Sequence, residues 1–263
     1  MNKVVNFIVR YVAALFGSVY LLLIGFVRGP NRRLLYEIAH HFTGMNPDPN
    51  RPKPELPVIS LRELFPVEPA IRLREAGVAD GNVTPLELIV IDQLIVKHAP
   101  KRILEIGTFD GRTTLNMATN TADDARVFTL DLPKTQLSDA ALPIEVGERT
   151  YVNKDLSGSR FIGTEYASKI TQLYGDSGTF DFSPYANSID FVFVDGSHSY
   201  DYVLNDSRVA LRILRNGKGV MLWHDFDAWG GVTIALNELF KAGNEFKGLK
   251  HIAGTTLAYA HFT

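Results

Sequence analysis

Beyond residue 80, the hydrophobic positions form short unbroken runs that alternate with longer segments of helical periodicity. Runs of four to eight apolar residues are typical of buried strands, and the periodic segments are typical of helices. The predicted strands are 102–106, 126–130, 169–174, 189–194 and 219–223, with two short ones near 249–252 and 256–260. The predicted helices are 85–98, a segment after Gly111, 200–214 and 231–242. This alternation predicts an α/β fold in which a doubly wound, mostly parallel sheet is covered by helices on both faces.

The first of these helices has clear start and stop signals. Thr84 is a suitable N-cap residue, Pro85 suits the first helical position, and Glu87 completes a capping box. Pro100 ends the segment, so the helix is predicted to reach about His98.

The N-terminal region has a different hydrophobic pattern. Residues 4–27 are apolar apart from Asn6 and Arg10, and 11–27 is a 17-residue run without charge. This length predicts a membrane-anchoring helix within residues 1–30, and Arg28 with the arginines after it places the C-terminal side in the cytoplasm. The alternative is a hairpin or a helix that lies flat on the membrane.

Residues 31–57 are predicted to connect this segment to a folded domain. The apolar positions of 31–42 share one helical face behind two arginines, which indicates an interfacial helix on the membrane surface. Residues 46–57 contain five prolines and therefore form an extended linker. The folded domain is expected to cover 58–263.

Composition narrows the function only a little. The chain has 263 residues, is 46% hydrophobic and 21% charged, and has a net charge of −2. These values are ordinary for a globular protein and give no reason to expect a nucleic-acid partner. The absence of cysteine excludes disulfides, thiolate metal sites and a cysteine nucleophile.

A glycine turn follows the first predicted strand, in RILEIGTFDGRTT (102–114). Glu105, Gly107 and Gly111 give the spacing E-x-G-x-x-x-G, and Phe109 stands where a dinucleotide-binding motif has its second glycine. A buried strand that enters a glycine turn and then a helix is where α/β proteins bind small molecules.

Each of five predicted strands ends at or near an acid: Glu105, Asp131, Asp176, Asp195 and Asp225. The carboxyl ends of parallel strands form one edge of a sheet, so these carboxylates are expected to line one cleft. Asp131 follows the glycine turn by about 20 residues, where a carboxylate accepts hydrogen bonds from ribose hydroxyls. Asp176 and Ser177 would then face the base of the same nucleoside. Each acid taken alone is also consistent with ordinary helix capping.

Asp195 and Asp225 end neighbouring strands if the sheet is wound as expected, and His224 precedes Asp225. Oxygen ligands with open positions suit Mg²⁺ or Mn²⁺, so these three residues are candidate metal ligands. The alternative is that Asp195 caps a helix and His224 packs in the core. His198 lies at the mouth of the same cleft and is the candidate general base, although a plain loop histidine is as consistent with its position.

Several motifs occur in order at these strand ends: ILEIGTFDG, TLD, YGDS, DFVFVDGSHSY and LRNGKGVMLWHDF. Over about residues 80–263 they resemble the class I S-adenosylmethionine-dependent methyltransferases, and most closely the small-molecule O-methyltransferases of catechols and macrolide sugars. The resemblance implies a Rossmann-like sheet of seven strands in the order 3-2-1-4-5-7-6, with strand 7 antiparallel. It also implies roles for the cleft residues: Glu105, Gly107, Phe109, Gly111 and Thr113 around the methionine part of the cofactor, Asp131 at the ribose, Asp176 and Ser177 at the adenine, Asp195, His224 and Asp225 at a metal, and His198 as the base. His224 departs from the family's acidic metal pair, so the metal is less firmly implied than the cofactor.

Two other functions remain open from the sequence: a nicotinamide-dependent oxidoreductase, and a membrane-tethered binding module without catalysis. The expected partner of the enzyme is a small-molecule or glycan hydroxyl acceptor, and a second copy of the chain is a further candidate partner. The membrane segment suggests a lipid-linked glycan as acceptor. Acceptor contacts are expected from 58–82 and 132–168, and the candidate walls are Tyr151, Phe161, Tyr166, Trp223 and Trp229.

Overall fold

The computed structural model describes residues 3–28, 31, 35, 52–77, 81–144 and 148–263. It divides into two compact units, Met1–Arg51 and Pro52–Thr263. Apart from residues 31 and 35, the predicted interfacial helix lies outside the described residues, and so does the first part of the proline-rich linker.

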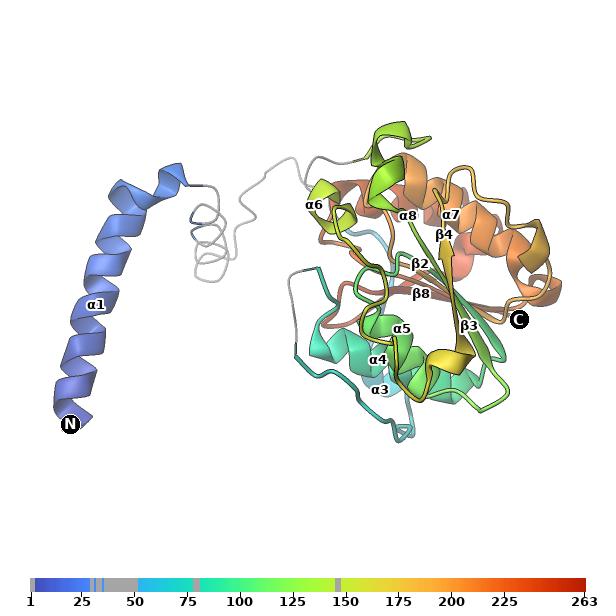
Figure 1. Ribbon diagram of the computed structural model, residues 1–263, viewed down its shortest axis with the longest axis horizontal. Coiled ribbons are helices and arrows are strands. Elements are labelled where there is room, and N and C mark those ends of the chain that lie inside the picture. Colours follow the sequence, from blue (N-terminus) through green and yellow to red (C-terminus); the bar gives the residue numbers. More distant parts are fainter. Residues whose placement is uncertain (1–2, 29–30, 32–34, 36–51, 78–80, 145–147) are drawn as a thin grey trace. The chain divides into compact units, whose positions relative to one another are not determined.

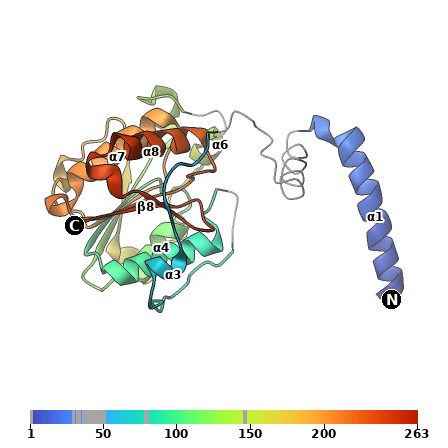
Figure 2. The same ribbon diagram turned by 180° about the vertical axis from the view of Figure 1, so that it is seen from behind.

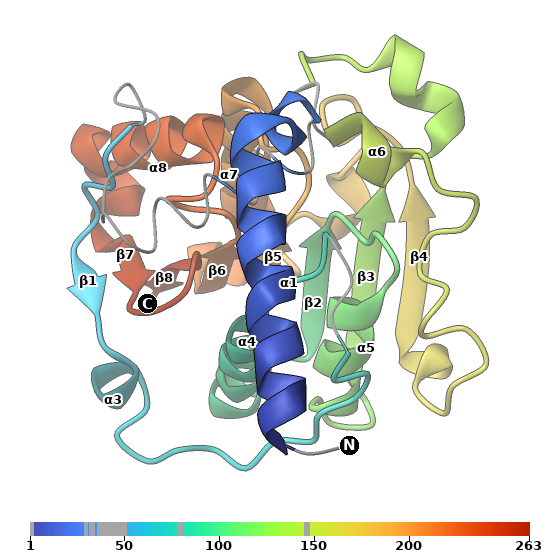
Figure 3. The ribbon, with the colours of Figure 1, turned by 90° about the vertical axis from the view of Figure 1, so that its left-hand side faces the viewer.

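The second unit is built on one eight-stranded sheet in the order β1-β7-β8-β6-β5-β2-β3-β4 (Figure 3). All neighbouring strands are parallel except at β8, which runs antiparallel to β6 and β7. The strands are β1 (Val58–Ile59), β2 (Arg102–Ile106), β3 (Arg126–Asp131), β4 (Ile170–Tyr174), β5 (Phe191–Val194), β6 (Gly219–Trp223), β7 (Lys250–Ile252) and β8 (Ala258–Phe262).

Strands β2 to β8 are the seven strands predicted from the sequence, in the predicted order and with the predicted antiparallel strand. The predicted number of strands is wrong, because β1 adds an eighth at the edge next to β7. A strand of two residues has no hydrophobic periodicity of its own. It forms because Val58 and Ile59 pair with residues almost 200 positions later in the chain.

Helices cover both faces of the sheet (Figures 1 and 2). Side chains alternate along each strand, so neighbouring residues face opposite layers. Phe193 and Leu222 pack in one apolar cluster with α4 (Pro85–His98) and α5 (Arg112–Thr119). Val194 and Trp223 pack in the other with α7 (Tyr200–Ile213) and α8 (Gly230–Ala242). The remaining helices of the unit are short: α3 (Leu61–Leu64), α6 (Arg149–Val152), η2 (Lys134–Asp139), η4 (Ala167–Lys169), η5 (Ser183–Tyr185), η6 (Arg215–Gly217) and η7 (Asn244–Gly248).

The start of α4 forms as its sequence predicts. The Thr84 hydroxyl accepts the Glu87 backbone N–H at 3.3 Å, and the Glu87 carboxylate accepts the Thr84 backbone N–H at 2.8 Å. Pro85 occupies the first helical position. The helix ends at His98, because Ala99 adopts a left-handed conformation before Pro100.

Helix α1 (Lys3–Leu23) is the main element of the first unit, and it is followed by the 3₁₀ helix η1 (Gly25–Val27). The uncharged run predicted to span a membrane is thus not one helix. The part of α1 beyond Arg10 has thirteen residues, which extend about 20 Å at 1.5 Å per residue, against a bilayer core of about 30 Å.

Among the described residues, no helix is both long enough and apolar enough to cross a membrane. The predicted membrane anchor and the cytoplasmic placement derived from it are therefore wrong. The suggestion of a lipid-linked acceptor loses its basis with them.

In the described parts of the crossover from β3 to β4, residues 132–144 and 148–169, the helices are the short η2, α6 and η4. Figure 3 shows α6 beyond the carboxyl ends of β2 and β3. This crossover therefore lies at the sheet edge where the predicted acids end their strands.

Candidate active site

The glycine turn after β2 is held tightly against its neighbours. Gly107 has a φ of +101°, and a Cβ atom there would lie 1.9 Å from the Asp195 carbonyl oxygen. Its N–H donates to the Leu130 carbonyl at 2.8 Å. Gly111 has a φ of +83° and begins α5, and a Cβ there would lie 2.7 Å from the Gly158 Cα. Glycine is therefore required at both positions, and the turn touches the ends of β3 and β5 as well as the crossover.

Glu105 lies beneath this turn rather than in the open cleft. The register of β2 and β3 places it opposite Thr129, whose hydroxyl donates to Glu105 Oε2 at 2.6 Å. The Thr114 hydroxyl of α5 donates to the same oxygen. Burial raises the pKa of Glu105 to about 8, although the two hydroxyls act to lower it. The carboxyl group thus joins β2, β3 and α5.

Asp131 at the end of β3 is contacted by the crossover. Ser157 donates its hydroxyl to Asp131 Oδ2, and Lys154 Nζ lies 2.7 Å from the same oxygen. The Asp131 side chain is 8% exposed and that of Lys154 is 17% exposed. The candidate ribose carboxylate is therefore already part of a largely buried ion pair.

Asp176 is satisfied in a similar way by neutral donors. Its Oδ2 accepts the Ala141 N–H at 2.6 Å, and its Oδ1 accepts the Tyr202 hydroxyl and the Gly178 N–H, each at 2.8 Å. The following residue, Ser177, is bound through its carbonyl oxygen to the side chain of Asn205 in α7. The carboxylate thus fixes the loop after β4 to the crossover and to α7.

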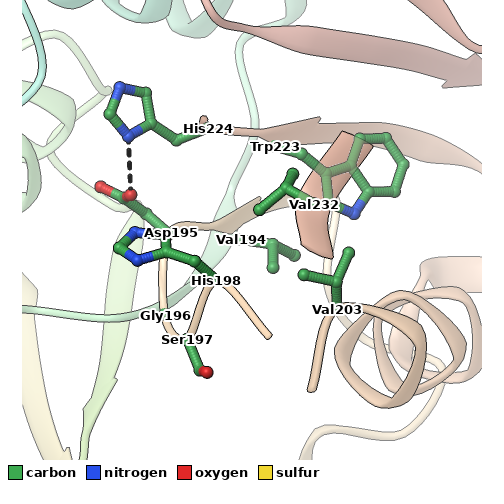
Figure 4. Close-up of a pocket in the computed structure, with 9 residues that line it drawn as sticks. All are labelled: Val194, Asp195, Gly196, Ser197, His198, Val203, Trp223, His224 and Val232. Carbon is green, nitrogen blue, oxygen red and sulfur yellow. Dashed lines mark hydrogen bonds and ion pairs between the residues drawn. The ribbon is translucent and has the colours of Figure 1, made fainter. Parts of the chain in front are cut away.

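A cluster of charged side chains forms where β5 and β6 end. These strands pair Val194 with Trp223, so Asp195 and His224 lie side by side. His224 Nδ1 is 2.9 Å from Asp195 Oδ1 and 3.1 Å from Asp225 Oδ2 (Figure 4 shows the first contact). One donor atom from each of Asp195, His224 and Asp225 lies within 4.8 Å of the others. The three predicted metal ligands therefore do come together.

His198 joins this cluster from the loop before α7. Its Nε2 lies 2.8 Å from Asp225 Oδ2, and its Nδ1 lies 2.9 Å from Glu148 Oε1, close enough for an ion pair although not aligned as a hydrogen bond. The ring stacks on Trp229, with the ring centres 4.3 Å apart. His198 therefore lies between two carboxylates and against one aromatic face.

These contacts set the charges of the cluster. Burial disfavours a charged imidazole, but Asp225 and Glu148 outweigh this effect and raise the pKa of His198 to about 9. Burial likewise opposes charge on His224, yet Asp195 and Asp225 hold its pKa well above the usual range. For Asp225, the two imidazoles outweigh burial and hold its pKa well below the usual range. In this arrangement both histidines carry a proton at neutral pH.

Glu87 reaches the same cluster from the first turn of α4. Its Oε2 lies 3.3 Å from His224 Nε2, and its Oε1 accepts the Thr256 N–H at 2.7 Å. Burial alone would raise its pKa, but His224 and the backbone N–H groups lower it to about 2. A residue recognised from sequence only as a helix cap is also a partner of the candidate metal ligand.

A small pocket adjoins the cluster. Figure 4 shows it between the ends of β5 and β6, where Asp195, His198 and His224 meet an apolar wall of Val194, Val203, Trp223 and Val232. Its lining residues belong mainly to the two strand ends and to the core under α7 and α8, so the pocket suits a small group rather than a whole ligand.

Comparison with known proteins gives one sequence family. Residues 104–226 match a family described as a methyltransferase domain, from β2 to just beyond the Asp225 cluster. Residues 104–226 form a methyltransferase domain. The prediction of a class I S-adenosylmethionine-dependent methyltransferase is thereby confirmed, and the nicotinamide-dependent alternative loses its support.

A solved O-methyltransferase structure has the same fold as this methyltransferase domain. The O-methyltransferase TomG from Streptomyces achromogenes, involved in tomaymycin synthesis and solved with S-adenosylmethionine, is 19% identical, with a TM-score of 0.51 over 73% of this chain and 92% of its own. The S-adenosylhomocysteine-bound methyltransferase PaMTH1 from Podospora anserina is 17% identical, with a TM-score of 0.48 over 70% and 81%. At this identity the similarity to TomG shows the fold alone. No curated protein sequence matches the chain.

The methyltransferase domain brings most of the predicted site residues to one sheet edge. The exception is Glu105, which is buried below the turn, whereas Thr113 lies in the first turn of α5. Of the predicted aromatic walls, Trp229 and Tyr151 reach the site, because Tyr151 packs edge-on against Phe109. Trp223 is buried in the core and also lines the pocket beside the cluster. Phe161 is buried as a packing residue, and Tyr166 packs against Arg74.

Sequence reasoning missed four charged or hydroxyl residues at the site: Glu87, Glu148, Lys154 and Ser157. Three of them come from the crossover, whose sequence has no strand or helix periodicity that would place them. The sequence predicts only that 132–168 supplies acceptor contacts, without indicating particular residues. The roles of these three depend on contacts with side chains 23 to 50 positions away in the chain.

Proposed function

We propose that the chain transfers the methyl group of S-adenosylmethionine to a hydroxyl oxygen of a small molecule or glycan. The observation that carries the proposal is the packing of the glycine turn against Asp195, since Gly107 has no room even for a Cβ atom there. A cofactor bound at the turn would thus lie next to the charged cluster of Asp195, His198, His224 and Asp225. Methyl transfer needs the acceptor oxygen in line with the sulfonium methyl, so positioning is the largest contribution available.

The residues proposed to bind the cofactor follow the cleft. The methionine end of the cofactor would bind at the turn formed by Gly107, Phe109 and Gly111. The neighbouring Glu105 and Thr113 support this turn. Asp131 binds the ribose, and Asp176 with Ser177 lies at the adenine. The close packing of the turn supports this placement, because a Cβ atom at Gly107 would clash with the Asp195 carbonyl and one at Gly111 with the Gly158 backbone, so the turn can present only backbone there.

The donor set of Asp195, His224 and Asp225 fits a divalent ion. Two carboxylate oxygens and one imidazole nitrogen lie within 4.8 Å of one another. The nitrogen donor favours Mn²⁺ over Mg²⁺, which prefers oxygen ligands alone. When bound, such an ion would orient the acceptor hydroxyl and lower its pKa.

His198 is the proposed proton acceptor. It is buried beside Asp225, and its ring is held flat by Trp229. Because both ring nitrogens face carboxylates, the imidazole holds its proton at neutral pH and acts as a base only after losing it. The fraction able to act therefore increases with pH up to the His198 pKa of about 9.

Isotope-labelled S-adenosylmethionine provides the test. The chain would be incubated with a catechol and, separately, with a set of free sugars, with Mn²⁺, with Mg²⁺ or with a chelator. Label transferred to oxygen, identified by mass analysis of the product, is the expected result. Calorimetry that detects no binding of S-adenosylhomocysteine would reject the cofactor site itself.

A binding module without catalysis is the second candidate. It keeps the cleft and the cofactor but transfers no methyl group. The charged cluster argues against it, because four titratable groups held in contact are costly to bury without a function. Transfer that depends on an added metal ion would exclude this candidate.

A further inference from the structure

The ammonium group of Lys154 lies between the two ends of the proposed cofactor site. Besides its 2.7 Å contact with Asp131 Oδ2, it donates to the Tyr151 carbonyl at 3.1 Å and lies 5.8 Å from the centre of the Phe109 ring. Asp131 is the proposed ribose residue, and Phe109 belongs to the glycine turn. One cation from the crossover is therefore within reach of both.

The Lys154 side chain also covers Asp131. Ser157 and Lys154 both contact Oδ2, and only 8% of the Asp131 side chain is exposed. A ribose hydroxyl that binds this carboxylate must therefore compete with the ammonium group. Lysine has a flexible four-carbon stem, so its head can move while its backbone stays in place.

The charges around the glycine turn indicate where the ammonium can go. The methionine end of S-adenosylmethionine carries a carboxylate, and the acids at the strand ends would repel it. Arg160 is bound to Asp110 at 2.7 Å and to Glu75 at 2.8 Å. Arg112 is fully buried and donates to backbone carbonyls. Among the described cations at this turn, Lys154 is the one whose partner a bound ribose would replace.

We propose that Lys154 exchanges partners when the cofactor binds. The ribose hydroxyls then donate hydrogen bonds to the Asp131 carboxylate, and the ammonium group of Lys154 pairs with the carboxylate of the methionine end. Lys154 is then a specificity-determining residue that selects ligands with an intact amino-acid part. This inference rests on the proposed cofactor site.

Two probes separate the two halves of this exchange. S-adenosylhomocysteine has both the ribose and the carboxylate, whereas 5′-methylthioadenosine has the ribose but no carboxylate. Calorimetry would compare both probes on the intact chain, Lys154→Met, Lys154→Arg and Lys134→Met. Lys134 is the matched control, because it lies in the same crossover and pairs with Asp155 at an exposed position.

In Lys154→Met, 5′-methylthioadenosine is expected to bind more tightly because its competitor is gone. S-adenosylhomocysteine gains nothing, because it loses the carboxylate contact. Its preference over 5′-methylthioadenosine should fall about tenfold, equivalent to about 1.4 kcal/mol, the scale of one charge-assisted hydrogen bond. Lys154→Arg and Lys134→Met should keep the preference of the intact chain.

Equal changes for both probes in Lys154→Met, or no change, would overturn the exchange. The unfolding midpoint of each variant shows whether it keeps its fold. Lys154→Arg provides a comparison in which the positive charge is retained. If the intact chain binds neither probe, the proposed cofactor site fails. If it binds both but Lys154→Met keeps its preference, only the partner exchange fails.

Discussion

The two ends of the candidate site hold their carboxylates in different ways. At the nucleoside end, Asp131 and Asp176 are satisfied by a lysine, hydroxyls and backbone N–H groups. At the acceptor end, Asp195 and Asp225 face two imidazoles, and all four groups titrate. The acceptor end is thus expected to change its charge as pH rises toward the His198 pKa of about 9. Binding and transfer should respond to different substitutions and different conditions.

Asp225→Asn tests this contrast with the largest expected effect. Asp225 contacts both histidines and has a φ of +64°, which asparagine tolerates, so the backbone should be retained. We expect methyl transfer to fall by about a thousandfold, within the range for loss of acid–base and positioning groups. Binding of S-adenosylhomocysteine, measured by calorimetry, should stay within about twofold. A comparable loss of binding would show that the two ends are not separable.

The pH dependence of transfer is the next largest effect. His198 must lose its proton before it accepts one, so the reactive fraction increases about tenfold per pH unit below its pKa of about 9. Between pH 7 and 9 the rate should therefore increase by up to about a hundredfold. The acceptor should be an aliphatic alcohol, whose own hydroxyl does not ionise in this range. His198→Gln should be slow and should lack this dependence, and a flat profile for the intact chain would assign the base to another group.

Asp131→Asn is expected to weaken cofactor binding at the nucleoside end of the site. Loss of the carboxylate removes the charged acceptor for the ribose hydroxyls, so the affinity for S-adenosylhomocysteine should fall about tenfold. Asp181→Asn is a suitable control because Asp181 is exposed beyond β4. Calorimetry that gives the same affinity for Asp131→Asn and the intact chain would remove the ribose assignment.

Glu148→Gln is expected to have the smallest effect, a shift of the pH profile alone. It removes one of the two carboxylates that raise the pKa of His198, so the pH at which transfer levels off should move down. The affinity for S-adenosylhomocysteine should not change. Glu165→Gln, at an exposed position of the same crossover, should leave both measurements as they are. A profile that keeps its midpoint in Glu148→Gln would mean that Glu148 serves the loop structure alone.

The parts of this fold that the sequence predicts are those with local causes. The strands 102–106 and 219–223 and the helix 85–98 have the predicted bounds, because apolar runs and a capping box determine them. The strand predicted from residue 189 begins at Phe191, since Ile189 makes only an isolated bridge. Strand β1 and the end of α1 at Leu23 were not predicted, because the first depends on a distant partner and the second on where a helix stops.

The candidate site divides in the same way. Residues at the ends of strands, such as Asp131 and Asp195, are placed by the topology of a parallel sheet, so their grouping could be predicted. Glu148 and Lys154 come from a crossover without periodicity, and only the folded chain shows what they contact. The protonation state of His198 could not be predicted either, because it depends on two carboxylates, and one of them comes from that crossover.

The absence of space at Gly107 also limits how this enzyme can be redesigned. The backbone of the glycine turn and the Asp195 carbonyl meet without an intervening side chain. In the proposed site, main-chain contact therefore sets the distance between the methyl donor and the acceptor cluster. No side-chain exchange at that contact can widen or narrow it. Larger or smaller acceptors would have to be accommodated from the opposite wall, at Trp229 and in the crossover that carries Glu148. Libraries intended to change acceptor scope should therefore vary those two segments and leave the turn unchanged.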